Sequence, residues 1–229
     1  LLFVYAIGKF TNGFIADYCN IRRFMATGLV ISSLVNLVMG LLGLLSGWAG
    51  LCSVLVFAIF FITWGLNGWV QSMGAPPGVI SLSRWFPLRT RGTYYSIFCA
   101  TPYLGKSVSM VLLGHVVMLA GWQCGFIAAA LAGFIGSVVI LLFVSDTPES
   151  RGLPSVQELS GEKPQKEDSI PTKVLHKAVL KNPGVWVIAL SSAFVYITQY
   201  GISNWGIFFL QKAKDFSLTE STYVIGISE

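Results

Sequence analysis

Long apolar stretches without charge alternate with short polar segments along this 229-residue chain. Asp, Glu, Lys and Arg are absent from residues 24–83 and from residues 182–211, and Lys106 is the one such residue within 92–145. A soluble protein needs polar and charged side chains on its surface, whereas a helix that crosses a lipid bilayer needs roughly 20 mostly apolar residues. Each stretch is long enough for at least one such helix. The pattern therefore predicts an all-α integral membrane protein.

Short breaks divide the apolar stretches into separate helices. A pair of prolines ends one helix, because proline cannot continue the backbone hydrogen bonds. Two short turns combine glycine with a Trp of the kind that anchors at membrane interfaces. The expected helices cover 1–18, 24–45, 51–74, 93–119, 123–144 and 183–210, with the start of a seventh at 221–229; turns are expected at 46–50 and 120–122, a basic loop at 84–91 and a linker at 146–182.

The linker at 146–182 is rich in Ser, Glu, Lys and Pro, which makes it too polar to bury. It separates an N-terminal transmembrane bundle, 1–145, from the start of a C-terminal bundle, 183–229. Many secondary transporters are built from two such halves. The chain also opens and ends inside apolar segments, so we expect it to be part of a longer transporter-sized chain.

The basic residues gather on one side of the predicted path through the membrane. Eleven of the 15 Lys and Arg residues lie in the segments 18–23, 84–91 and 146–182, and the turns at 46–50 and 120–122 hold none. Basic loops stay on the cytoplasmic side of a membrane. We therefore expect a multi-pass protein of the inner (plasma) membrane with these three segments in the cytoplasm. The net charge of +5 reflects this topology and indicates no nucleic-acid partner.

A charged motif closes the first predicted helix. Gly13, Asp17, Arg22 and Arg23 resemble the loop between the second and third helices of major facilitator transporters, where a glycine, an aspartate and a basic pair follow in this order. A glycine there allows two helices to approach closely. The aspartate can cap or pair at a helix end, and the arginines anchor the cytoplasmic face.

Further segments sharpen the resemblance, and they cover almost the whole chain. Together they resemble the organophosphate:phosphate antiporter family, which includes bacterial glycerol-3-phosphate and hexose-phosphate transporters and a hexose-phosphate sensor. The segments are Tyr5–Phe10, Asn67–Pro77, Arg91–Gly92, Asp146–Glu149, Gly152–Val156, Asn182–Trp186 and Tyr196–Trp205.

The resemblance implies a twelve-helix major facilitator bundle, of which this chain would cover helices 2 to 8. It implies exchange of a phosphorylated small metabolite for inorganic phosphate by alternating access. We expect such a protein to act as a monomer in the lipid bilayer. No metal site, cofactor or catalytic residue is expected, because no constellation of nucleophile, base or metal ligands is visible.

Lys9 is the first candidate for substrate binding. A cation inside a membrane helix is costly unless it is paired, hydrated or able to reach the interface. Tyr5 lies one turn earlier on the same face, and both residues match positions that line the family's phosphate pathway. In the alternative interpretation, Lys9 extends to the cytoplasmic interface, since Asp17 is only eight residues away.

Lys106 is the second candidate, because it lies mid-helix with no acidic residue between Asp17 and Asp146. The alternative is a structural role, or pairing with a helix outside this chain.

Two departures from the family's pattern concern positions that line its substrate cavity. Gln199 stands where relatives commonly carry a phosphate-binding Arg, and Pro102 stands where they often carry a His.

Lys106 could supply the lost charge, one turn beyond Pro102. Tyr196, like Tyr5, matches a cavity position of the family. The expected substrate-binding set is therefore Tyr5, Lys9, Lys106, Tyr196 and Gln199.

Other functions remain open at the level of the sequence. One is a membrane sensor that binds the same ligand and signals to a two-component system, and another is a symporter for a different organic anion. Residues 100–107 fit a loose phosphate-loop pattern, but such a loop follows a buried strand in a soluble α/β sheet. Its place inside an apolar helix argues against ATP binding.

Overall fold

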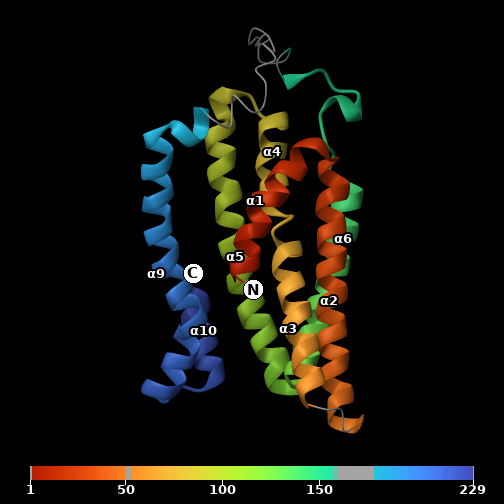
Figure 1. The fold of residues 1–229 in the computed structure, drawn as a ribbon, viewed down its shortest axis with the longest axis vertical. Helices are drawn as coiled ribbons and strands as arrows, with labels where there is room; N and C mark the ends of the chain where they lie inside the picture. Colours follow the sequence, from red (N-terminus) through yellow and green to blue (C-terminus); the bar gives the residue numbers. More distant parts are fainter. Residues whose placement is uncertain (1, 50–52, 157, 159–177, 229) are drawn as a thin grey trace. The chain divides into compact units, whose positions relative to one another are not determined.

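The computed structural model describes residues 2–49, 53–156, 158 and 178–228, and these form helices joined by short connections (Figure 1). No strand occurs among these described residues. Residues 157 and 159–177 of the predicted linker lie outside the described part. The helices are α1 Leu2–Tyr18, α2 Ile21–Ala49, α3 Ser53–Gln71, α4 Ala75–Trp85, α5 Leu88–Ala120, α6 Trp122–Phe143, α9 Pro183–Ala213 and α10 Leu218–Ser228, with a 3-10 turn at Glu149–Arg151.

The chain forms two compact units. The first holds α1 to α4, α6 and both ends of α5. The second holds Tyr103–Val111 of α5 together with α9 and α10.

Within the described residues, five helical segments are long and apolar enough to cross a membrane. The prediction of an all-α membrane architecture is therefore confirmed. The segments are Ile21–Leu45, Val54–Trp85, Leu88–Ala120, Trp122–Phe143 and Pro183–Ala213.

Most predicted helices are present, but the basic loop at 84–91 is wrong. Arg84 lies in the last turn of α4, and α5 begins already at Leu88. The two prolines at 76–77 begin α4 instead of only ending α3, because proline fits the first turn of a helix, where its missing N–H is not needed. Only the extended residues Phe86 and Pro87 separate the two helices.

The turns are also shifted in part. Gly121 makes the turn between α5 and α6 with a φ of 85°, a conformation open to glycine, so the turn at 120–122 is confirmed. The helix α2 continues to Ala49, which leaves little of the turn expected at 46–50. Residues 50–52 lie outside the described part.

Small residues let α2 and α6 pack closely in the first unit. A methyl group built on Gly40 of α2 would lie 2.7 Å from the Ile127 side chain and 3.0 Å from the Gln123 backbone oxygen of α6. One built on Gly133 of α6 would meet the Ser33 hydroxyl of α2. Close backbone approach at small residues is typical of helix pairs in membranes.

A second close approach joins α1 to the end of α3, at Gly8 and not at Gly13. A methyl group on Gly8 would meet the Ser72 hydroxyl and lie 3.1 Å from the Trp69 backbone oxygen. One on Gly13 would have no described atom within 4 Å. Gly13 lies on a different face of α1 from Gly8, turned away from α3, so among the described residues the close contact of α1 is at Gly8, and the packing role expected of Gly13 stays a prediction.

Pro102 interrupts the hydrogen bonds of α5, and a neighbouring threonine compensates. Pro102 has no N–H to donate to the Phe98 carbonyl one turn earlier. The Thr101 hydroxyl donates to that carbonyl at 2.8 Å. Threonine hydroxyls commonly satisfy backbone groups freed by proline in membrane helices.

Thr101→Val should lower the stability of the protein by about 1 kcal/mol, because it removes this hydrogen bond and leaves the Phe98 carbonyl without a donor. Thermal unfolding in detergent measures the change. The double variant Thr101→Val/Pro102→Ala should recover the loss, because the introduced alanine supplies a backbone N–H. Equal stability of Thr101→Val and wild type would contradict this role.

In the second unit, a tight turn connects α9 to α10. Asp215 adopts a positive φ of 56°, which Asp tolerates better than most residues. Ser217 and Glu220 then form a reciprocal cap at the start of α10: the Ser217 N–H donates to the Glu220 carboxylate at 2.9 Å, and the Glu220 N–H donates to the Ser217 hydroxyl at 3.2 Å. Gly206 of α9 lies directly against Ile225 of α10.

Candidate functional site

Tyr5 and Lys9 come together on α1, as their spacing predicts. The Lys9 ammonium lies over the Tyr5 ring, 4.9 Å from its centre. This is within the range of a cation–π interaction, which gains strength when water is excluded. Lys9 is exposed and Tyr5 half-buried in the first unit. The ring therefore stabilises the ammonium without neutralising it.

Behind Lys9, a buried polar group fixes α1 against α3. The Asn12 side-chain amide is fully buried and donates to the Ser72 hydroxyl at 2.7 Å and to the Trp69 carbonyl at 3.1 Å. The Trp69 indole donates to the Thr11 hydroxyl at 3.2 Å. These bonds surround the close approach of Gly8, so they hold the helix turn that carries Lys9.

A second buried pair joins α2 to α3. The Ser32 hydroxyl donates to the Asn67 side-chain oxygen at 2.7 Å, and both residues are buried. The Asn12 side-chain oxygen and the Asn67 side-chain nitrogen have no hydrogen-bond partner in the described part of the chain. Sequence reasoning noted the segment that contains Asn67 and missed Asn12, although an Asn within a membrane helix is a signal of helix-to-helix hydrogen bonding.

The other candidates lie in the second unit. Tyr196, Gln199 and Ser203 follow one another at spacings of three and four residues, which places them on one face of α9. Lys106 of α5 donates to the Ser203 hydroxyl. Tyr196 stacks on Tyr200, with ring centres 6.0 Å apart. Of these, Ser203 was not predicted as a site residue.

The predicted residues therefore form two sets. Tyr5 and Lys9 contact each other in the first unit, while Lys106, Tyr196 and Gln199 belong to the second. Their role in binding a substrate stays a prediction. Among the described residues, no group of three or more His, Cys, Asp or Glu side chains could hold a metal ion.

The charged motif after α1 connects helix ends. Asn20 caps α2 by accepting from the Arg23 N–H at 3.1 Å. The Arg22 guanidinium donates to the Leu141 carbonyl in the last turn of α6. A cation there suits the negative end of the helix dipole. The Asp17 carboxylate forms no hydrogen bond or ion pair with other described residues.

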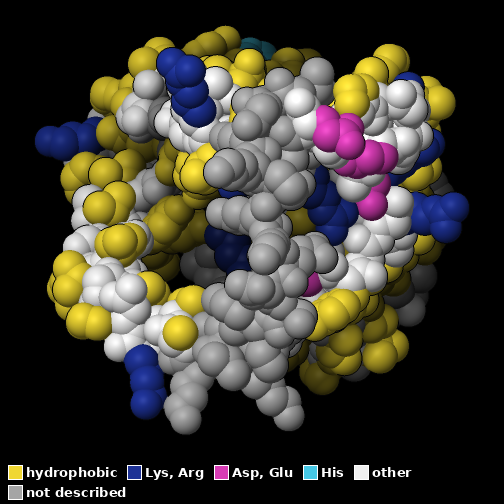
Figure 2. All heavy atoms as spheres, turned by 90° about the horizontal axis from the view of Figure 1, so that it is seen from above, with side chains coloured by type: hydrophobic (Ala, Val, Ile, Leu, Met, Phe, Trp, Pro, Cys, Tyr) yellow, Lys and Arg dark blue, Asp and Glu magenta, His cyan; other side chains and the backbone are white. Residues whose placement is uncertain are grey.

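Asp146, directly after α6, takes the pairing role that was expected of Asp17. Its carboxylate accepts from the Ile21 N–H at 3.0 Å, at the start of α2, and from the Arg84 guanidinium at 2.8 Å, at the end of α4. One carboxylate thus ties three helix ends together. Figure 2 looks onto this end of the molecule and shows basic and acidic side chains on it.

Asp146→Ala should destabilise the protein by about 1–2 kcal/mol, because α2 loses an acceptor at its first N–H and Arg84 loses its partner. The matched control is Asp17→Ala, which removes a carboxylate from the same end and should change stability little. Thermal unfolding in detergent compares the two. A larger effect of Asp17→Ala would contradict the assignment.

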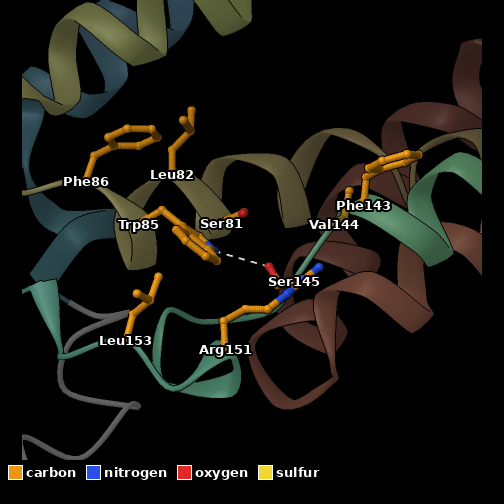
Figure 3. A pocket seen from close by; sticks show the side chains of 9 residues that line it. All are labelled: Ser81, Leu82, Trp85, Phe86, Phe143, Val144, Ser145, Arg151 and Leu153. Atoms are coloured by element: carbon orange, nitrogen blue, oxygen red, sulfur yellow. Dashed lines mark hydrogen bonds between the residues drawn. The ribbon is translucent and has the colours of Figure 1, made fainter.

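Beside this junction lies an open cavity of about 740 Å³, lined by α4, the end of α6 and the first linker residues (Figure 3). Its polar groups bond to one another: the Trp85 indole donates to the Ser145 carbonyl at 3.2 Å, and Arg151 donates to the Ser145 hydroxyl at 2.6 Å. The remaining lining is mostly apolar. These bonds attach the start of the linker to α4, which is a structural role.

Comparisons with known proteins agree with this architecture. The family profile of the Major Facilitator Superfamily matches residues 1–229. The glycerol-3-phosphate transporter of Bacillus subtilis (strain 168) is 35% identical over 227 residues, which cover 96% of this chain and 49% of the relative.

Two further relatives carry names that indicate different roles. The "Probable hexose phosphate transport protein" of Chlamydia muridarum is 29% identical, covering 100% of this chain and 51% of the relative. The "Membrane sensor protein UhpC" of Salmonella typhimurium is 26% identical, and the match covers 98% of this chain and 50% of the relative. The chain thus spans about half the length of the curated relatives it matches.

Proposed function

Because the chain belongs to the Major Facilitator Superfamily, we propose that it is part of a secondary transporter that moves a small organic anion, a phosphate ester, across the plasma membrane. Relatives named as glycerol-3-phosphate and hexose-phosphate transporters support the substrate class. The transporter exchanges the ester for inorganic phosphate by alternating access and needs no covalent chemistry.

The observation that carries this proposal is the position of Lys9 over the Tyr5 ring. An ammonium in a membrane helix is costly unless something compensates its charge. Within the described residues the compensation comes from an aromatic face and not from a carboxylate. A cation held in this way keeps its charge for an anionic ligand.

The arrangement of the chain in the membrane is also part of the proposal. The N-terminal bundle comprises residues 1–145 and the C-terminal bundle begins at 183, with the segment 146–182 as the cytoplasmic linker that follows the first bundle. The basic segments at 18–23 and 84–91 lie on the same cytoplasmic side, as the charge bias of such loops favours. The protein works as a monomer in the lipid bilayer.

Counterflow in proteoliposomes tests the transport function. The full-length protein is reconstituted with inorganic phosphate inside, and uptake of labelled glycerol 3-phosphate, glucose 6-phosphate and phosphoglycerate is measured from outside. We expect uptake of at least one ester, stimulated by internal phosphate. Absence of phosphate-stimulated uptake for all three esters would defeat the antiporter proposal.

A sensor is the second candidate, and similarity to a membrane sensor protein favours it. Such a protein would bind the same esters through the same residues but release them on the same side. Binding of an ester to the purified protein, combined with no counterflow, would support the sensor. Binding with counterflow would support the transporter.

A further inference from the structure

Lys106 and Ser203 meet inside two membrane helices. Lys106 is the one Asp, Glu, Lys or Arg residue in 92–145, and α9 carries none between Pro183 and Lys212. The Lys106 ammonium donates to the Ser203 hydroxyl, and both Lys106 and Ser203 are half-buried. A neutral hydroxyl solvates an ammonium without cancelling its charge.

Two glycines show which segments of the second unit lie near this pair. A methyl group built on Gly226 of α10 would be 3.6 Å from the Ser107 carbonyl and 3.5 Å from Val111 on α5. Gly206, three residues beyond Ser203, lies against Ile225 of α10. The three segments of the second unit therefore approach one another near Lys106, and the hydrogen bond to Ser203 places the ammonium beside that turn of α9.

The face of α9 beside the pair is polar. Gln199 lies one turn before Ser203, and Tyr196 lies one turn before Gln199. Gln199 offers an amide but no charge, so the positive charge available to this face comes from Lys106 at the level of Ser203. The electrostatic centre is therefore displaced from Gln199 by one helical turn, roughly 6 Å along the axis.

We propose that Lys106 and Ser203 form the anion subsite of this transporter, at the Ser203 turn of α9 and not at Gln199, with Ser203 as the positioning residue of the Lys106 ammonium. The ligand is a phosphate group, either free or as the end of an ester. This inference rests on the proposed function, because it specifies where the transported anion is held.

The exchange of partners follows from the strength of the hydrogen bonds. A phosphate oxygen carries charge and is a stronger acceptor for an ammonium than a serine hydroxyl is. An arriving phosphate therefore replaces the Ser203 oxygen as the acceptor of Lys106. The hydroxyl, released from accepting, donates its own hydrogen to the same phosphate. In the absence of substrate, the Ser203 oxygen therefore occupies the place beside the Lys106 ammonium that a phosphate oxygen takes on binding.

Binding of inorganic phosphate and of a transported ester to the purified full-length protein tests this subsite by titration calorimetry. Ser203→Ala should weaken binding about fivefold, the effect of one lost hydrogen bond, and Lys106→Ala should weaken it about 30-fold or more. Ser203→Thr keeps the hydroxyl and should bind like wild type. Ser192→Ala, on the same face of α9 three turns earlier, is the matched control and should leave binding unchanged.

The double variant Lys106→Ala/Ser203→Ala separates positioning from folding. If Ser203 positions Lys106 as well as donating to the phosphate, the double variant should lose less binding than the sum of the two single losses, because coupled residues are not additive. Additive losses, or a loss in Ser203→Thr equal to that in Ser203→Ala, would overturn the positioning role.

The same measurements distinguish this inference from the proposed function. In one outcome, wild type binds and transports esters and Lys9→Ala loses both activities, while the Lys106 and Ser203 variants behave like wild type. This outcome would overturn the subsite and leave the proposed transport function standing. If wild type neither binds nor transports any phosphate ester, the proposed function fails and the subsite with it.

Discussion

Lys9→Ala is expected to reduce phosphate-ester uptake by about 30-fold or more, because removing the cation that pairs with a bound anion costs about 2 kcal/mol or more. The ammonium over Tyr5 is held by an aromatic ring and forms no ion pair within the described part of the chain, so the substitution leaves no acidic residue there without its partner. The substitution should therefore weaken only the binding of the anionic substrate. Initial rates of counterflow in proteoliposomes measure it.

Two variants show whether the charge itself is responsible. Lys9→Arg keeps a cation that can also stack on Tyr5, so it should retain more uptake than Lys9→Ala. Lys212→Ala removes a lysine from the last turn of α9 and should leave uptake unchanged. If Lys9 only extends to the interface, Lys9→Ala will transport like Lys212→Ala, and Lys9 will not be a substrate-binding residue.

Gly8→Ala is the second change with a large expected effect. The added methyl group would meet the Ser72 hydroxyl and come within 3.1 Å of the Trp69 carbonyl, a backbone atom that cannot turn away. Overpacking of this kind destabilises by about 1–3 kcal/mol. It also separates α1 from α3 beside the Asn12–Ser72 hydrogen bond, next to Lys9. We therefore expect a lower unfolding temperature in detergent and slower uptake.

Gly13→Ala is the matched control, because it makes the same change on the same helix where no described atom lies within 4 Å. An alanine in the interior of a helix is more favourable than a glycine by about 0.5–1 kcal/mol. Gly13→Ala should therefore be neutral or stabilising, with normal uptake. Equal effects of the two substitutions would contradict the assignment of Gly8 as the close contact.

Helical structure and membrane character follow from local chemistry and were predictable. Residues 24–83 without charge indicate membrane helices whatever their neighbours. The prolines at 76–77 were placed correctly as a break but were not predicted to begin α4. Proline can end one helix and begin another with the same geometry, so the break by itself does not show that a helix follows; in the structure Gly78 of α4 lies directly against Phe98 of α5.

The candidate site was partly predictable. Tyr5 and Lys9 are neighbours on one helix face, so their contact follows from spacing. Ser203 is 97 residues from Lys106, and nothing in the local pattern connects them. Asp146 is likewise 125 residues from Ile21. Motif reasoning assigned the pairing role to Asp17, because a sequence places an acid near a helix end but does not show which helix end is its neighbour.

The sequence by itself determined that this protein is helical, spans a membrane and carries isolated cations within its apolar segments. These properties depend on the composition and spacing of nearby residues, which hydration and helix periodicity convert directly into structure. The tertiary structure alone decided which glycine is the close contact, which acid ties the helix ends, and that Lys106 donates to Ser203. Such contacts depend on the distance between residues far apart in the chain, and that distance is fixed only when the helices pack.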